Sequence, residues 1–244
     1  MRAWVAGALL ALTMLAGAPA GLADQADAPT PDGFQEAWEM VESWLVDRME
    51  REGVVGGSLY VVHEGEVVER LHHGHADLAS GREVDEETIY HWASITKTLT
   101  AVSLMQLRDR GELSLDDPIV SYLPELRGVH DPHGPVTDVT LRHLLSHSSG
   151  FRSPTWPWGG GEPWHPHEPS GWEQLVSMIP YTRLDFAPGE RFQYSNPGII
   201  FVGRVIEQLS GDDIEVYVDK NVLSPLGMDR AYFDRTPYHL LEHR

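Results

Sequence analysis

The chain has 244 residues, a formal net charge of −19 at pH 7 and no cysteine. A surface this acidic argues against nucleic acid and anionic lipid as partners, because both would repel it. Since no disulfide can form, packing alone must hold the fold together.

The first 23 residues are predicted to be a secretory signal peptide. Arg2 gives a short positive start, an apolar run extends to Leu15, and the small residues that follow allow cleavage after Ala20 or Ala23. The run is short for a membrane span of about 20 residues. We therefore expect a cleaved signal rather than an anchor, no stable membrane insertion afterwards, and a periplasmic or extracellular protein. Loss of Arg2 would take the charge from −19 to −20.

Residues 24–32, rich in Asp, Ala and Pro, are predicted to be a linker, and residues 33–244 to form the folded domain. Apolar residues recur at helical spacing over 33–51, which predicts an amphipathic helix; they are Phe34, Trp38, Val41, Leu45 and Met49. Two β-rich runs, 58–63 and 67–71, flank Glu64-Gly65 and predict a β-hairpin. A loop through Gly74 and Gly81 is expected to follow.

The remainder is predicted to be largely helical. A helix is expected over 94–110, with Gly111 as its C-terminal cap. Short helices and turns are expected over 112–150, and further helices over 173–180, 197–210 and 212–223. Residues 153–172 are predicted to form a long loop, and loops of that length are usually functional or mobile. Four tryptophans in it allow either an aromatic wall over a substrate or simple packing; they are Trp156, Trp158, Trp164 and Trp172.

Ser94-Ile-Thr-Lys97 is the central motif. Residues three apart lie on one face of a helix, so the Lys97 amine can reach the Ser94 hydroxyl. A serine needs an adjacent base to act as a nucleophile, and a lysine can serve if its pKa is lowered. With so few lysines in the chain, one such pair is expected by chance roughly 13% of the time.

Tyr194-Ser-Asn196 is the second motif, a hundred residues later. A phenol can relay a proton between nucleophile and leaving group, and an asparagine amide can bind a substrate amide. A Tyr-x-Asn sequence is expected by chance roughly 7% of the time in this composition, so the two motifs together indicate a functional site.

These segments resemble the class C β-lactamases, the D-Ala-D-Ala carboxypeptidases and the related esterases. The resemblance runs from about residue 36 to the end. It is carried by Tyr90-His-Trp-Ala-Ser-Ile-Thr-Lys, Gly111-Glu-Leu-Ser-Leu-Asp-Asp-Pro, Leu141-Arg-His-Leu-Leu-Ser-His-Ser-Ser-Gly, Tyr194-Ser-Asn-Pro-Gly and Pro225-Leu-Gly-Met-Asp.

The resemblance implies an α/β plus α, β-lactamase/transpeptidase-like fold and acyl-enzyme chemistry without a cofactor. By motif position Ser94 would be the nucleophile, Lys97 and Tyr194 the base and proton relay, and Asn196 a substrate contact. The implied substrate is a small molecule or peptide whose amide or ester bond is cleaved: a β-lactam, a D-Ala peptide or a small ester.

One family feature is absent from the sequence. The family carries a third motif, Lys-Thr-Gly or His-x-Gly, on a later strand, and neither pattern follows Asn196. That strand normally supplies the second oxyanion donor. We therefore expect a truncated sequence, which lacks the C-terminal strands of the central sheet and whose residues 24–244 alone are poorly stable and poorly active.

Among the other functions that such a sequence allows, a non-catalytic sensor or an inactive fragment stays open. An α/β-hydrolase would need Gly-x-Ser-x-Gly, which does not occur. A non-catalytic penicillin-binding-like sensor, or an inactive fragment, would keep the pocket without turnover. The histidines, including His143 and His147 at i, i+4 on an expected helix, show no His-Glu-x-x-His pattern, so no metal is predicted.

Overall fold

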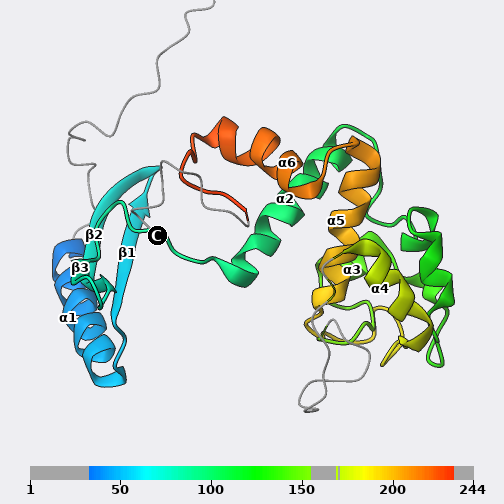
Figure 1. Cartoon of the computed structure of the whole chain (residues 1–244), viewed down its shortest axis with the longest axis horizontal. Helices are drawn as coiled ribbons and strands as arrows, with labels where there is room; N and C mark the ends of the chain where they lie inside the picture. Colours follow the sequence, from blue (N-terminus) through cyan, green and yellow to red (C-terminus); the bar gives the residue numbers. More distant parts are fainter. Residues whose placement is uncertain (1–32, 155–168, 170, 234–244) are drawn as a thin grey trace, which may run out of the picture. The chain divides into compact units, whose positions relative to one another are not determined.

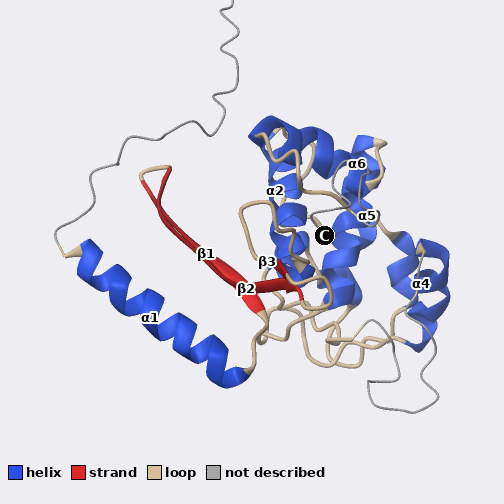
Figure 2. Cartoon of the chain, turned by 60° about the vertical axis from the view of Figure 1, so that its left-hand side comes forward, coloured by secondary structure: helices blue, strands red, loops and turns tan. Residues whose placement is uncertain are grey.

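A computed structural model describes residues 33–154, 169 and 171–233. These residues form two compact units, one ending at Thr88 and one beginning at Ile89. The segments predicted as signal peptide and linker, and most of the tryptophan-rich loop, lie outside the described residues. The strands of the described residues, red in Figure 2, all come before Ile89 and so belong to the first unit.

The first unit consists of a helix and a small antiparallel sheet (Figure 1). Its elements are α1 (Phe34–Glu52), β1 (Gly56–His63), β2 (Glu66–Asp77) and β3 (Arg82–Glu83), and the strand order is β1-β2-β3. The predicted helix is confirmed to within one residue at each end. It stops at Gly53, whose left-handed φ of 69° lets Gly53 and Val54 bond back to the carbonyls of the last turn.

The predicted hairpin is confirmed, and Glu64 and Gly65 both have positive φ, as a tight two-residue turn requires. The expectation of a loop through Gly74 is wrong. β2 continues to Asp77 and pairs with β3. The strand needs glycine at position 74. A Cβ there would come 2.1 Å from the Val55 carbonyl oxygen, so only glycine allows the two backbones to approach so closely.

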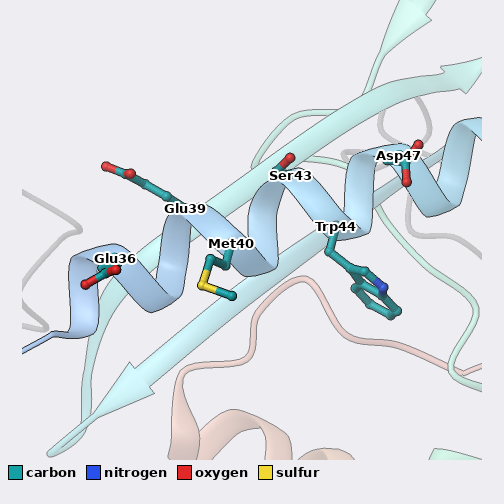
Figure 3. A pocket seen from close by; sticks show the side chains of 6 residues that line it. All are labelled: Glu36, Glu39, Met40, Ser43, Trp44 and Asp47. Carbon is teal, nitrogen blue, oxygen red and sulfur yellow. The ribbon is translucent and has the colours of Figure 1, made fainter.

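One face of α1 is buried and the other is exposed. Trp38 and Met49 are buried, and the Met49 side chain packs over Gly57 of β1. On the outer face, Met40 and Trp44 are exposed along an open hollow (Figure 3). All six residues that line it belong to α1: Glu36, Glu39, Met40, Ser43, Trp44 and Asp47.

The second unit is helical. A 3-10 turn, Ala93–Ile95, leads into its first α-helix, and its α-helices are α2 (Thr96–Asp109), α3 (Leu141–Leu145), α4 (Trp172–Met178), α5 (Asn196–Ser210) and α6 (Ile214–Val218). The chain runs on from α6 through a π turn, Asp219–Leu223, and a 3-10 turn, Ser224–Leu226, so the predicted helix over 212–223 is confirmed as a composite of helix types. Short 3-10 turns fill 119–138, as expected.

The core of the second unit includes the contact between α2 and α5 (Figure 1) and extends over the short helices and turns of residues 113–184. Leu104 and Leu107 of α2 and Val202 and Ile206 of α5 are all at most 1% exposed. Full burial of such a side chain stabilises the fold by about 1.5–3 kcal/mol. The packing of these two helices fixes the positions of their N-terminal ends, where the predicted motifs lie.

Candidate active site

Ser94 lies at the entrance to α2. It occupies the 3-10 turn Ala93–Ile95, directly before the helix, and is exposed. The first hydrogen bond of this helical segment runs from the Ile95 amide to the Trp92 carbonyl, so the Ser94 amide lies before the ladder begins. Ala93 has a φ of 46°, an uncommon left-handed conformation for a non-glycine residue. Such strained backbone is concentrated at functional sites.

Lys97 follows on the first turn of α2 and is half-buried. Its amine donates a hydrogen bond of 3.2 Å to the Ser94 Oγ. The same amine lies 5.0 Å from the centroid of the Tyr194 ring. Lys97 therefore contacts both of the other predicted reactive side chains.

Tyr194 reaches the same point from the segment before α5. Its hydroxyl lies 2.7 Å from the Ser94 Oγ. Interaction with the Lys97 amine, and then the hydrogen bond with Ser94, hold the pKa of the Tyr194 phenol below its usual value. A phenol with a lowered pKa gives up its proton more readily, which is what a proton relay near neutral pH needs.

Asn196 lies close to Tyr194 in the chain, but among the described residues its side chain does not join the contacts among Ser94, Lys97 and Tyr194. It is the first residue of α5, next to the cap Ser195, whose hydroxyl accepts a hydrogen bond from the Gly198 amide. The Asn196 amide N–H donates to the Ser153 carbonyl. In the described chain its side chain makes no hydrogen bond with Ser94, Lys97 or Tyr194.

His147 is the residue that the sequence analysis placed wrongly. It was expected on one helix with His143, but α3 ends at Leu145 and His147 follows with a φ of 55°. His143 stays in the helix and forms a reciprocal cap with Thr140. The His147 ring instead turns to Tyr194, at 4.7 Å between centroids. The i, i+4 spacing could not predict this contact with Tyr194, because the contact depends on α3 ending at Leu145.

The remaining expectations concern metals and membranes. In the described ranges, no three His, Asp or Glu side chains gather closely enough to hold a metal ion. None of the helices described is both long and apolar enough to cross a bilayer. Trp172 alone of the four loop tryptophans is described, and it packs at the N-terminus of α4 against Phe201 of the core.

The chain is similar in sequence to known hydrolases and penicillin-binding proteins. The family model described as Beta-lactamase matches residues 41–239. Esterase EstB of Burkholderia gladioli is 34% identical over 187 residues, which make up 72% of this chain and 46% of the esterase. Penicillin-binding protein 4* of Bacillus subtilis is 26% identical over 77% of this chain and 40% of its own length. The chain thus spans about half the length of the curated relatives that it matches.

Solved structures agree with the predicted architecture. The octameric penicillin-binding protein homologue from Pyrococcus abyssi superposes with a TM-score of 0.69 and 34% identity, over 81% of this chain and 45% of that one. A class C β-lactamase gives a TM-score of 0.73 at 24% identity, over 86% and 55% of the two chains. These likenesses confirm the β-lactamase/transpeptidase-like fold, α/β plus α.

Proposed function

Because the chain belongs to the β-lactamase family, we propose that it is a serine hydrolase that forms a covalent acyl-enzyme on Ser94. The observation that carries the proposal is the convergence of two side chains, Tyr194 and Lys97, on the Ser94 Oγ. The Ser94 Oγ lies 2.7 Å from the Tyr194 hydroxyl and 3.2 Å from the Lys97 amine. A nucleophile within hydrogen-bond reach of one group that can take its proton and of an amine that can stabilise the phenolate is the arrangement that the proposed acyl transfer needs.

In the proposed acylation, the Ser94 Oγ forms a bond to the substrate carbonyl carbon as its proton passes to Tyr194. The lowered pKa of Tyr194 makes the phenolate accessible, and the Lys97 amine stabilises that charge. The tetrahedral intermediate then collapses, the bond to the leaving group breaks, and Tyr194 returns the proton to the leaving oxygen or nitrogen. The Ser94 amide, at the start of the helical segment, is positioned to donate to the oxyanion.

Deacylation repeats these steps with water. A water molecule attacks the acyl carbon and gives a proton to Tyr194, the bond to the Ser94 Oγ breaks, and the proton returns to Ser94. Asn196, at the start of α5, is proposed to bind a polar group of the substrate. No cofactor enters these steps.

The proposed substrate is an ester or an amide of a small acyl compound. The name of the relative at 34% identity, an esterase, supports an ester as the first compound to test. The names of relatives at 26–28% identity support a β-lactam or a cell-wall peptide as the next. We propose export to the periplasm or the extracellular space on the ground of the predicted signal peptide.

The test is covalent labelling of the full chain with a fluorophosphonate, followed by peptide mapping. We expect the label on Ser94, no label in Ser94→Ala, and full labelling in Ser177→Ala, which alters an exposed serine of α4 far along the chain. Label that persists in a folded Ser94→Ala would overturn the proposal. Penicillin that acylates Ser94 without being released would identify a sensor in place of a hydrolase.

A further inference from the structure

His147 is held in a rare backbone conformation between α3 and the segment that carries Tyr194. Its φ of 55° is left-handed, which few residues other than glycine adopt. This conformation turns the His147 carbonyl toward the Gln193 amide, which donates to it at 2.7 Å. One side of Tyr194 is thereby tied to the His147 backbone.

The His147 ring ties the other side. The Ser195 amide donates to the ring Nδ1 at 3.2 Å. The residues before and after Tyr194 therefore both donate a backbone hydrogen bond to the same residue. Ser195 is fully buried and caps α5, and His147 is half-buried, so this bond is partly shielded from water.

The ring also lies against the Tyr194 side chain. The two rings are tilted by 37° with centroids 4.7 Å apart, which limits rotation of the phenol. The Phe192 ring packs edge-on to the His147 ring at 5.8 Å. His147 thus contacts residues 192, 193, 194 and 195 in succession.

The contact with Ser195 requires a neutral ring. Because Nδ1 accepts a hydrogen bond, the proton of the neutral imidazole must lie on Nε2. Protonation would place a second N–H on Nδ1, facing the Ser195 N–H, and the bond would be lost. The charged and titratable groups that face the ring are Lys97 from α2 and Tyr194 itself. Burial, and then the charge of Lys97, lower the pKa of His147.

We propose that His147 is a positioning residue that holds Tyr194 in reach of Ser94, and that it does so only as the neutral Nε2–H tautomer. This inference rests on the proposed function of Ser94 and Tyr194. It predicts that acid switches the site off by releasing the Tyr194 segment as His147 takes up a proton.

Two variants separate the acceptor from the ring. His147→Ala removes the acceptor and places alanine in a left-handed conformation. His147→Asn keeps an acceptor, because its Oδ1 can take the place of Nδ1, and asparagine tolerates a positive φ, but it does not titrate. His143→Asn is the matched control, since His143 also accepts a backbone N–H through Nδ1, from Thr140 in the α3 cap.

The first measurement is the rate of fluorophosphonate labelling of Ser94 from about pH 5 to about pH 8. His147→Ala is expected to label about tenfold to a hundredfold more slowly at every pH, as a misplaced relay should. His147→Asn is expected to recover most of the rate and to lose the acid limb that the wild type and His143→Asn share. Wild-type labelling by a folded His147→Ala, or an unchanged acid limb in His147→Asn, would overturn the proposal.

The second measurement does not depend on labelling. In NMR spectra of the full chain, the Ser195 amide signal should shift with pH at the same midpoint as the His147 ring, and that midpoint should lie below the ordinary histidine value. If Ser94 takes no label while these signals titrate together, the proposed function fails and the positioning contact stands. A Ser195 amide that does not respond when His147 titrates would refute the contact itself.

Discussion

The Tyr194 hydroxyl lies 2.7 Å from the Ser94 Oγ, although a hundred residues separate the two along the chain. Each residue lies two positions before the first residue of a helix: Ser94 before α2 and Tyr194 before α5. Because these helices pack together through the core, their N-terminal ends meet at one place. In the proposed acyl transfer, the positive ends of both helix dipoles would favour the negative charge that develops.

Lys97→Ala is expected to lower the rate of Ser94 labelling by about 10²–10⁴, the usual contribution of a general acid–base group. Loss of the amine also removes the main cause of the lowered Tyr194 pKa, so that pKa should rise toward its ordinary value. Labelling kinetics and an NMR titration of the Tyr194 ring measure the two effects. Lys220→Ala is the control, because Lys220 pairs with Asp212 on the surface; equal rates in both variants would contradict a role for Lys97.

Tyr194→Phe removes one hydroxyl and should leave the fold intact. If Tyr194 relays protons, labelling and ester turnover should fall by about 10²–10⁴. Tyr122→Phe loses a comparable hydroxyl, which donates to Asp117 at 2.6 Å in the same unit. That control is expected to lose about 1.5–3 kcal/mol of stability, as for a hydrogen bond to a charged group, and no activity. Unchanged turnover in a folded Tyr194→Phe would make Tyr194 a packing residue.

The sequence predicted those elements whose formation depends on residues close together in the chain. The helical spacing of Trp38 and Met49 predicted α1, and Glu64-Gly65 predicted the hairpin turn, because each depends on neighbours in the chain. β3 was not predicted: it has two residues, and its pairing with β2 comes from tertiary contact rather than from a run of β-forming residues.

The site was predicted in the same uneven way. The spacing of Ser94 and Lys97 predicted their contact, because residues three apart lie on the same face of a helix. The contact between Ser94 and Tyr194 was predicted only from the family resemblance, since no local pattern relates residues so far apart in the chain. The role that we propose for His147 was missed because it depends on where α3 ends and on a positive φ, neither of which periodicity reports.

Gly150→Ala should destabilise the second unit far more than Gly111→Ala. Both glycines have positive φ, so both variants carry a strain of about 1 kcal/mol. At Gly150 a Cβ would also come 2.5 Å from the Phe186 carbonyl oxygen, whereas at Gly111 it would meet open space. Urea unfolding, followed through amide signals of the buried Leu144 and Val205, measures the difference. Equal stability of the two variants would show that the backbone at Gly150 relaxes without loss.

The pH dependence of stability gives a further test of His147. Its pKa is lowered in the folded protein, so between the folded pKa and the ordinary value of about 6.5 the unfolded chain binds more protons. Unfolding is then favoured by acid. The contribution of His147 is fully present above about pH 6.5 and is lost as the pH falls through the folded pKa.

Wild type is therefore expected to lose more stability than His147→Asn when the pH is lowered from about 8 to about 5. Carboxylates and the other histidines titrate equally in both proteins, so the difference between the two curves isolates His147. Burial is the larger cause of the lowered pKa and Lys97 the smaller. Since salt screens charges but does not reverse burial, about 1 M salt should reduce the difference without removing it. Parallel curves for wild type and His147→Asn would show that His147 does not titrate in this range, whereas a difference abolished by salt would assign the effect to Lys97 alone.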